Sequence, residues 1–109
     1  MKSVTYYARF GYCDDGICVN FPDVHGAYTC GNTKAEAITM AEDVLKLCLD
    51  SEEMYVNDIF LPSHLEDLEA ESNWVLEEYE NSFEFVPITV TLTTEVYQAK
   101  IKPHQRLKN

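Results

Sequence analysis

The chain of 109 residues has the length of a single domain, and its 46% apolar and 12% aromatic content is typical of a folded protein. Its formal net charge of −11 repels nucleic acid and anionic membranes and attracts basic proteins, which disfavours a nucleic-acid-binding or membrane-bound body. Neither a signal segment nor a run approaching roughly 20 apolar residues occurs, so we expect a cytoplasmic protein without a membrane span.

Strict alternation of side chains predicts a first β-strand over residues 3–12. One face carries Val4, Tyr6, Ala8, Phe10 and Tyr12, and the other carries Ser3, Thr5, Tyr7 and Arg9. The turn Asp14-Asp15-Gly16 and the alternating run 17–21 complete a β-hairpin, which ends at Pro22. A short third strand is predicted over residues 27–30, before the break at Gly31-Asn32.

A helix is predicted to begin at Thr33. Thr33-Lys34-Ala35-Glu36 has the form of a capping box, in which the hydroxyl and the carboxylate each accept a backbone N–H. Apolar side chains then recur at helical spacing as far as about residue 50, at Ala37, Ile38, Ala41, Val44, Leu45, Cys48 and Leu49. One side of this helix should therefore pack on the sheet, while Glu42, Asp43 and Lys46 face water.

Residues 50–84 hold 12 carboxylates and no Lys or Arg. Pro62-Ser63 is expected to open a short helix over residues 64–68, and Trp74-Val75-Leu76 is expected to anchor this region to the core. Renewed alternation predicts a last strand over residues 86–92, in which Pro87 indicates an edge or strand-start position because proline donates no ladder hydrogen bond.

These elements predict an α+β fold, an antiparallel sheet with β-β-β-α-β order and its helix on one face, as in part of a ribonuclease-H-like layout. We expect one domain over residues 1–99, with an acidic insertion at about 51–84. Residues 1–99 contain all 19 carboxylates of the chain but only four Lys and Arg residues, which gives this domain a net charge of −15. Residues 100–109 carry Lys100, Lys102, Arg106 and Lys108 without any acid, which predicts a basic C-terminal tail.

Nothing in the sequence favours catalysis, and we expect no catalytic residue, cofactor or metal. Asp14, Asp15 and Asp23 lie in turns, where aspartate serves turn chemistry, and His25 has no adjacent nucleophile. The cysteines, Cys13, Cys18, Cys30 and Cys48, lack Cys-x-x-Cys spacing, so we expect free thiols, two of them in the core.

The run Phe-Pro-Asp-Val-His-Gly-Ala-Tyr-Thr-Cys-Gly-Asn-Thr-Lys-Ala-Glu-Ala at residues 21–37 resembles the HicB antitoxin family. That family has a strand ending in Phe-Pro-Asp, a glycine turn, a short strand to Gly-Asp-Thr, and Glu-Ala inside a helix. The opening run 6–10 and the pair Pro62-Ser63 agree as well, so the resemblance covers about residues 4–65. Asn32 replaces the usual aspartate, and both side chains accept the same capping hydrogen bond.

The resemblance implies an antitoxin whose partner is a HicA-like toxin, a small basic RNA-cleaving protein. An acidic surface suits competition with RNA for the cations of such a toxin. Partner-binding residues are therefore expected at Glu66, Asp67, Glu69 and Glu71. Tyr7 and Tyr28, on the aromatic second face, are further candidates, and they fit equally a place in the core or a strand surface that pairs with another subunit.

Members of this family commonly continue into a helix-turn-helix or ribbon-helix-helix domain that binds operator DNA. Here only the short basic tail of ten residues, 100–109, is present, too few for either domain, so we expect no sequence-specific DNA binding by this chain alone. A homo-oligomer, either a dimer or a tetramer, is expected because both faces of the sheet carry apolar side chains.

Three other functions fit the same sequence. One is an acidic nucleic-acid mimic that inhibits another nucleic-acid-binding protein, and one is an orphan oligomeric domain without a toxin. The third is a metal-dependent nuclease, which the placement of the aspartates in turns disfavours.

Overall fold

The computed structural model describes residues 2–50, 58–71 and 75–103. The elements in chain order are β1 (Lys2–Cys13), β2 (Gly16–Asn20), β3 (Tyr28–Gly31), α1 (Lys34–Asp50), β4 (Ile59–Phe60), α2 (Leu65–Ala70), β5 (Glu80–Leu92), α3 (Val96–Lys100) and β6 (Ile101–Lys102). The predicted β-β-β-α-β order is confirmed, with β5 as the last long strand. The short elements β4, α2, α3 and β6 add to it.

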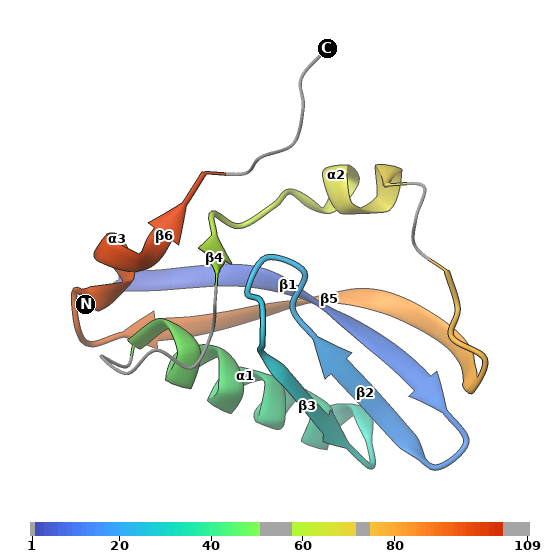
Figure 1. Ribbon diagram of the computed structural model, residues 1–109. Coiled ribbons are helices and arrows are strands. Elements are labelled where there is room, and N and C mark those ends of the chain that lie inside the picture. Colours follow the sequence, from blue (N-terminus) through green and yellow to red (C-terminus); the bar gives the residue numbers. More distant parts are fainter. Residues whose placement is uncertain (1, 51–57, 72–74, 104–109) are drawn as a thin grey trace.

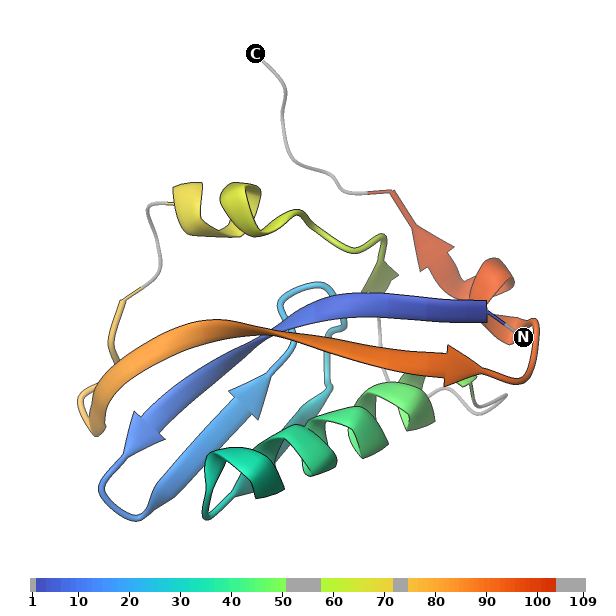
Figure 2. The same ribbon diagram turned by 180° about the vertical axis from the view of Figure 1, so that it is seen from behind.

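Four strands form the main sheet in the order β3-β2-β1-β5, and every neighbouring pair is antiparallel. The long strand β1 lies inside the sheet and pairs with β2 on one side and β5 on the other. Helix α1 runs along one side of this sheet, and α2 lies on the opposite side (Figures 1 and 2). The predicted α+β class with a helix on one face is therefore confirmed.

The hydrophobic core lies between the sheet and α1. Alternate residues of β1 and β5 and one stripe of α1 are buried in it, among them Tyr6, Ala8, Phe10, Val86, Ile88, Ala37, Ala41, Leu45 and Leu49. The missing side chain of Gly31 lets α1 approach β3 closely, since a Cβ on Gly31 would lie 2.6 Å from the backbone nitrogen of Ala37. The apolar side chains that alternate along the strands and those that recur at helical spacing on α1 thus pack together in one apolar layer.

Strand β5 begins at Glu80, well before the predicted start at residue 86. The polar residues at its beginning conceal the alternation, but they pair with the end of β1 as far as Cys13, past an irregularity between Tyr12 and Cys13. Strand β5 lies at the edge of the sheet, which confirms the position indicated by Pro87.

The connections at one end of the core are fixed by polar side chains. The Asp23 carboxylate accepts hydrogen bonds from the Ser63 backbone N–H (2.8 Å) and hydroxyl (2.9 Å). The Tyr6 hydroxyl donates to the Phe60 carbonyl oxygen (2.6 Å) and contacts the Tyr97 hydroxyl (2.8 Å). The first set of bonds joins the turn after β2 to the loop after β4. The second set joins β1 to β4 and to α3.

Two expectations about packing were wrong. Val75 and Leu76 do not anchor their segment to the core, because they are 65% and 49% exposed, while Trp74 lies outside the described residues. The segment is held by other contacts, described below. Of the cysteines, all four of which are free thiols, only Cys48 is buried in the core, whereas Cys18 and Cys30 are exposed.

The acidic insertion and the basic tail contain regular structure. Lys100 ends α3, and Lys102 lies in β6, where its ammonium group pairs with Asp58 (2.6 Å). Residues 104–109, with Arg106 and Lys108, lie outside the described part. Among the described residues no helix combines the length and the apolar character needed to cross a membrane.

Asp50, at the end of α1, accepts hydrogen bonds from the backbone N–H and hydroxyl groups of Thr93 (2.9 and 2.8 Å) and of Thr94 (2.8 and 2.7 Å). Burial acts to raise the pKa of Asp50, but the hydrogen bonds from the Thr94 and Thr93 donors outweigh it and hold the pKa well below its ordinary value. The ionised carboxylate therefore links α1 to the turn after β5.

We expect Asp50→Ala to lower the free energy of unfolding by about 2–3 kcal/mol at neutral pH, because several charge-assisted hydrogen bonds are lost. A lowered pKa stabilises the fold above the ordinary carboxylate pKa of about 4, and this stabilisation shrinks as the pH falls below that value. The difference between the variant and the parent in urea unfolding should accordingly narrow from pH 7 to pH 3. Asp43→Ala, at an exposed site on the same helix, is the control, and an equal loss in both variants would contradict the prediction.

Candidate partner-binding face

The side of the sheet that faces away from α1 is here named the distal face. Strand register places on it Ser3, Thr5, Tyr7, Arg9 and Gly11 of β1, Cys18 and Asn20 of β2, Tyr28 and Cys30 of β3, and Phe83, Phe85, Pro87, Thr89 and Thr91 of β5. The face is therefore mixed in character: it bears aromatic rings, hydroxyl groups, thiols and one arginine.

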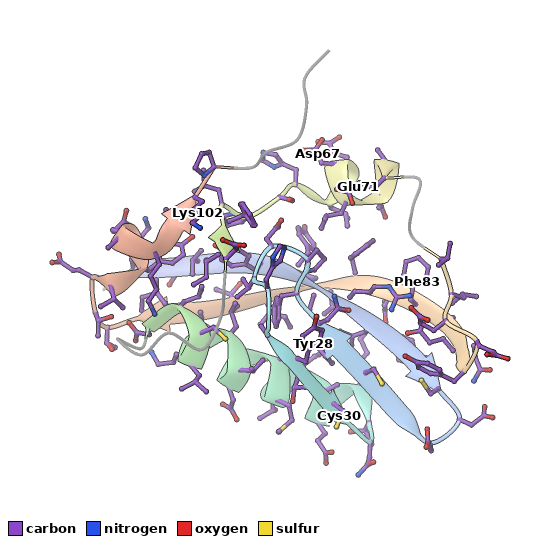
Figure 3. The ribbon with its side chains drawn as sticks, in the orientation of Figure 1. Tyr28, Cys30, Asp67, Glu71, Phe83 and Lys102 are labelled. Carbon is purple, nitrogen blue, oxygen red and sulfur yellow. The ribbon has the colours of Figure 1, made fainter. Side chains whose placement is uncertain are left out.

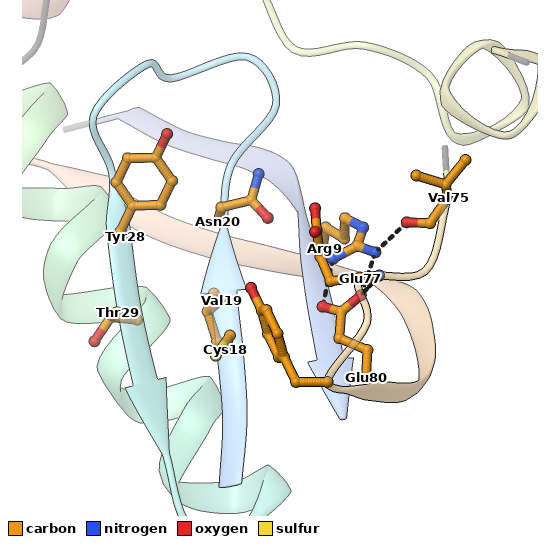
Figure 4. Close-up of a pocket in the computed structure, with 10 residues that line it drawn as sticks. Arg9, Cys18, Val19, Asn20, Tyr28, Thr29, Val75, Glu77 and Glu80 are labelled. Atoms are coloured by element: carbon orange, nitrogen blue, oxygen red, sulfur yellow. Dashed lines mark hydrogen bonds and ion pairs between the residues drawn. The ribbon is translucent and has the colours of Figure 1, made fainter. Parts of the chain in front are cut away.

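A buried ion pair organises one half of the distal face. Nη1 and Nη2 of Arg9 donate to the two carboxylate oxygens of Glu80 at 2.9 and 2.8 Å, and Nη2 also donates to the Val75 carbonyl oxygen at 3.1 Å (Figure 4). The two side chains are only 10% and 2% exposed. This bidentate pair holds the segment 75–80 across the sheet.

The groups around the Arg9–Glu80 pair stabilise the charged form of both side chains. The backbone N–H of Glu77 also donates to Glu80 (3.0 Å), and the Arg9 guanidinium lies 4.4 Å from the centre of the Phe83 ring. Hydrogen bonds from Arg9 hold the pKa of Glu80 below its ordinary value, and the same contact raises the pKa of Arg9. Both groups stay ionised at neutral pH.

Glycine is required beneath this pair. A Cβ on Gly11 would lie 1.8 Å from a carboxylate oxygen of Glu80 and 3.2 Å from a guanidinium nitrogen of Arg9. The missing side chain therefore provides the space in which the carboxylate meets the arginine.

Beside the ion pair lies a hollow of about 550 Å³, bounded by β2, β3 and the segment 75–80. Its lining includes Tyr28, Tyr79 and Val75, whose side chains are 70%, 63% and 65% exposed, and the Glu77 carboxylate (Figure 4). Because the charges of Arg9 and Glu80 compensate each other, Glu77 gives the lining a net negative charge. The hollow is suited to apolar contact with a cationic partner.

The four predicted acidic residues lie on α2 or at its end. Glu66, Asp67 and Glu69 are exposed and form no ion pair with a described residue, whereas Glu71 is half-buried. Glu69 and Glu71 line a second hollow together with Leu65, Phe83, Glu84 and Phe85 of α2 and β5. Figure 3 shows Asp67 on α2 and Glu71 just after its end, above the sheet that carries Phe83.

The predicted site residues fall into two groups on the distal side of the sheet. The acidic residues of α2 meet β5 at the second hollow, while Tyr28 lies on the opposite edge strand and lines the first hollow. Tyr7 is half-buried on β1 opposite Pro87. Sequence reasoning missed Arg9, Glu80 and Tyr79; the available signal was a single arginine among the first 99 residues, placed in mid-strand.

Other carboxylates of the acidic insertion have structural partners. Asp50 binds the turn after β5, Asp58 pairs with Lys102, and Glu84 accepts a hydrogen bond from the Tyr12 hydroxyl and pairs with Lys34 (3.2 Å). Within the described ranges, no three His, Cys, Asp or Glu side chains gather as metal ligands. The exposed acids on α2, like Glu77 at the first hollow, are therefore available to a partner.

No family model matches the chain. A stretch of 49 residues is 39% identical to Antitoxin HicB 2 of Photorhabdus laumondii. Over this stretch the chain is similar to a HicB antitoxin. The match spans 45% of this chain and 35% of that antitoxin, so the HicB resemblance is confirmed over part of each protein.

The fold of this chain also occurs in a solved structure titled "Toxin-Antitoxin complex from Streptococcus pneumoniae". The two chains align with a TM-score of 0.56 and 19% sequence identity, over 99% of this chain and 79% of that one. At this identity the likeness concerns the fold.

A double-mutant cycle tests how the distal face is held together. We expect Glu80→Ala to lower the free energy of unfolding by about 3 kcal/mol, because it leaves Arg9 buried without its carboxylate. Gly11→Ala should cost a similar amount in the parent, since the new methyl group displaces the carboxylate. In the Glu80→Ala background, Gly11→Ala should change the free energy of unfolding very little, because the clashing carboxylate oxygen of Glu80 is absent. Urea unfolding of the four proteins measures the coupling, and additive costs would contradict this arrangement.

Proposed function

We propose that this chain is a non-enzymatic cytoplasmic antitoxin that binds a small, basic, RNA-cleaving toxin of the HicA type and neutralises it. The observation that carries the proposal is the similarity to Antitoxin HicB 2. The fold shared with a chain of a toxin-antitoxin complex supports it. Neutralisation requires only that the antitoxin occupy the RNA-binding surface of its partner.

Charge supports a basic partner. The chain carries a net charge of −11, and a protein that binds RNA phosphates presents lysine and arginine on the surface that this antitoxin must cover. The exposed carboxylates of Glu66, Asp67 and Glu69 extend from α2 without an ion pair to a described residue. We assign to them, with Glu71, the long-range attraction of the toxin.

Apolar contact on the distal face supplies the second part of the interaction. Tyr28, with Tyr79 and Val75 around the first hollow, offers exposed aromatic and aliphatic surface, and Tyr7 lies between this hollow and β5. Large aromatic side chains contribute a large share of the binding energy in protein interfaces. We therefore assign the short-range contacts to this face.

The acidic residues of α2 can be tested by neutralisation. We expect the combined change Glu66→Gln, Asp67→Asn, Glu69→Gln and Glu71→Gln to slow association with a HicA-like toxin roughly tenfold at low salt. Dissociation should change much less, because complementary charge acts mainly on encounter. Stopped-flow or surface plasmon resonance measures both rates. The effect should nearly vanish at high salt, where screening extends over only about 3 Å.

The matched control neutralises four exposed carboxylates elsewhere, by Asp15→Asn, Glu42→Gln, Asp43→Asn and Glu95→Gln. It changes the net charge equally, so a larger effect at α2 identifies a local interaction. Equal slowing in both proteins would assign the attraction to the overall charge. No binding by the parent chain would overturn the proposed function.

The proposed function also predicts catalytic silence. With Mg²⁺ or Mn²⁺ the purified chain should leave single- and double-stranded RNA and DNA intact, because the Asp23 carboxylate is occupied by Ser63 in a buried turn. A gel-based nuclease assay checks this. Turnover that disappears in His25→Ala, a change at an exposed side chain, would show instead that the chain is a nuclease.

A further inference from the structure

Three thiols gather on the distal face, at the end of the β1–β2 hairpin and on β3. Cys18 and Cys30 are exposed and Cys13 is half-exposed, whereas Cys48 lies on α1 and is buried in the core. Cys18 lines the first hollow, and Figure 3 shows Cys30 on β3, the same strand that carries Tyr28. Solvent-borne reagents therefore have access to three thiols within one small area.

Strand register sets two of these thiols directly opposite each other. Cys18 of β2 pairs with Cys30 of β3 in an antiparallel ladder, so both side chains extend from the same face. Directly opposed residues have Cα atoms about 4.5–5.5 Å apart. Disulfides form across Cα distances of about 4.4–6.8 Å. The register thus places the pair within the Cα range of a disulfide.

Cys13 occupies a different position. It pairs with Gly16, while Cys18 pairs with Gly11, so Cys13 and Cys18 are diagonal neighbours. Diagonal Cα atoms lie about 7–8 Å apart, beyond the usual range of a disulfide. Desolvation and then the contact with Cys18, including a hydrogen bond, raise the pKa of the Cys13 thiol. The Cys13 thiol donates to the Gly11 carbonyl oxygen (3.8 Å), which favours its protonated form.

We propose that Cys18 and Cys30 form a reversible dithiol–disulfide site that reacts with a small oxidant, either a peroxide or a low-molecular-weight disulfide. With hydrogen peroxide, one thiolate attacks an oxygen, the O–O bond breaks, and a sulfenic acid and water result. The second sulfur then attacks the first, the S–O bond breaks, and a second water leaves. Two electrons pass from the sulfurs to the peroxide, and both thiol protons end in water.

The position of the site gives oxidation a consequence for partner binding, which rests on the proposed function. Cys18 lines the hollow to which we assign the short-range contacts, and Tyr28 lies two residues from Cys30 on the same side of β3. A bridge between β2 and β3 draws the Cys18 sulfur toward β3 and fixes this wall. Toxin binding then depends on the thiol state of the antitoxin.

The test oxidises the reduced full chain with hydrogen peroxide or with oxidised glutathione and maps peptides under non-reducing conditions. We expect the intact mass to fall by two hydrogen atoms, a peptide link between Cys18 and Cys30, and full reversal by dithiothreitol. Cys13→Ser and Cys48→Ser should retain the link, while Cys18→Ser and Cys30→Ser should abolish it. A link that includes Cys13, a bond between two chains, or a stable glutathione adduct would overturn the assignment.

Two further measurements separate the possible failures. The reduced variants Cys18→Ser and Cys30→Ser should unfold at the same temperature as the parent, since both sites are exposed. A missing disulfide in these variants then does not result from a loss of the fold. Reduced and oxidised parent are then titrated with the toxin, and oxidation should weaken binding about fivefold or more. Unchanged affinity would overturn the regulatory consequence. Absent binding by the reduced chain would overturn the proposed function, whereas the mapped link tests the thiol site by itself.

Discussion

The distal face depends on the ion pair between Arg9 and Glu80. A buried arginine in mid-strand is unfavourable without a carboxylate, and Glu80 reaches it only because Gly11 has no side chain. The pair holds the segment 75–80 over the sheet, and that segment forms one wall of the first hollow. The surface that we assign to a partner thus exists because two charges are satisfied beneath it.

Much of the fold follows from periodicity. The alternation of β1, the capping box at Thr33 and the apolar stripe of α1 each depend on neighbours in sequence, and each predicted its element within a few residues. The early start of β5 was missed because its first residues are polar and are held by β1, which is distant in sequence. Periodicity measures burial on one side, so it misses a strand end held by backbone pairing alone.

The candidate site was predicted less completely, for the same reason. Exposed acids and aromatic residues can be found in a sequence, and Glu66 and Tyr28 do lie at the surface. The partner of Arg9 stands 71 positions away, and nothing local distinguishes Glu80 from the acids around it. Val75 was expected in the core because it is apolar, yet its carbonyl oxygen, which any residue provides, makes the contact with Arg9. Such long-range pairs become visible only in three dimensions.

The position of Pro87 bears on the tendency of this protein to aggregate through the edge of its sheet. Strand β5 places 13 residues at an edge of the sheet, and the row of backbone groups along such an edge invites other chains to add strands and aggregate. Pro87, near the middle of that edge, has no N–H to offer and divides the row in two. The same residue that marks the edge in the sequence therefore disfavours edge-to-edge pairing between copies of this chain.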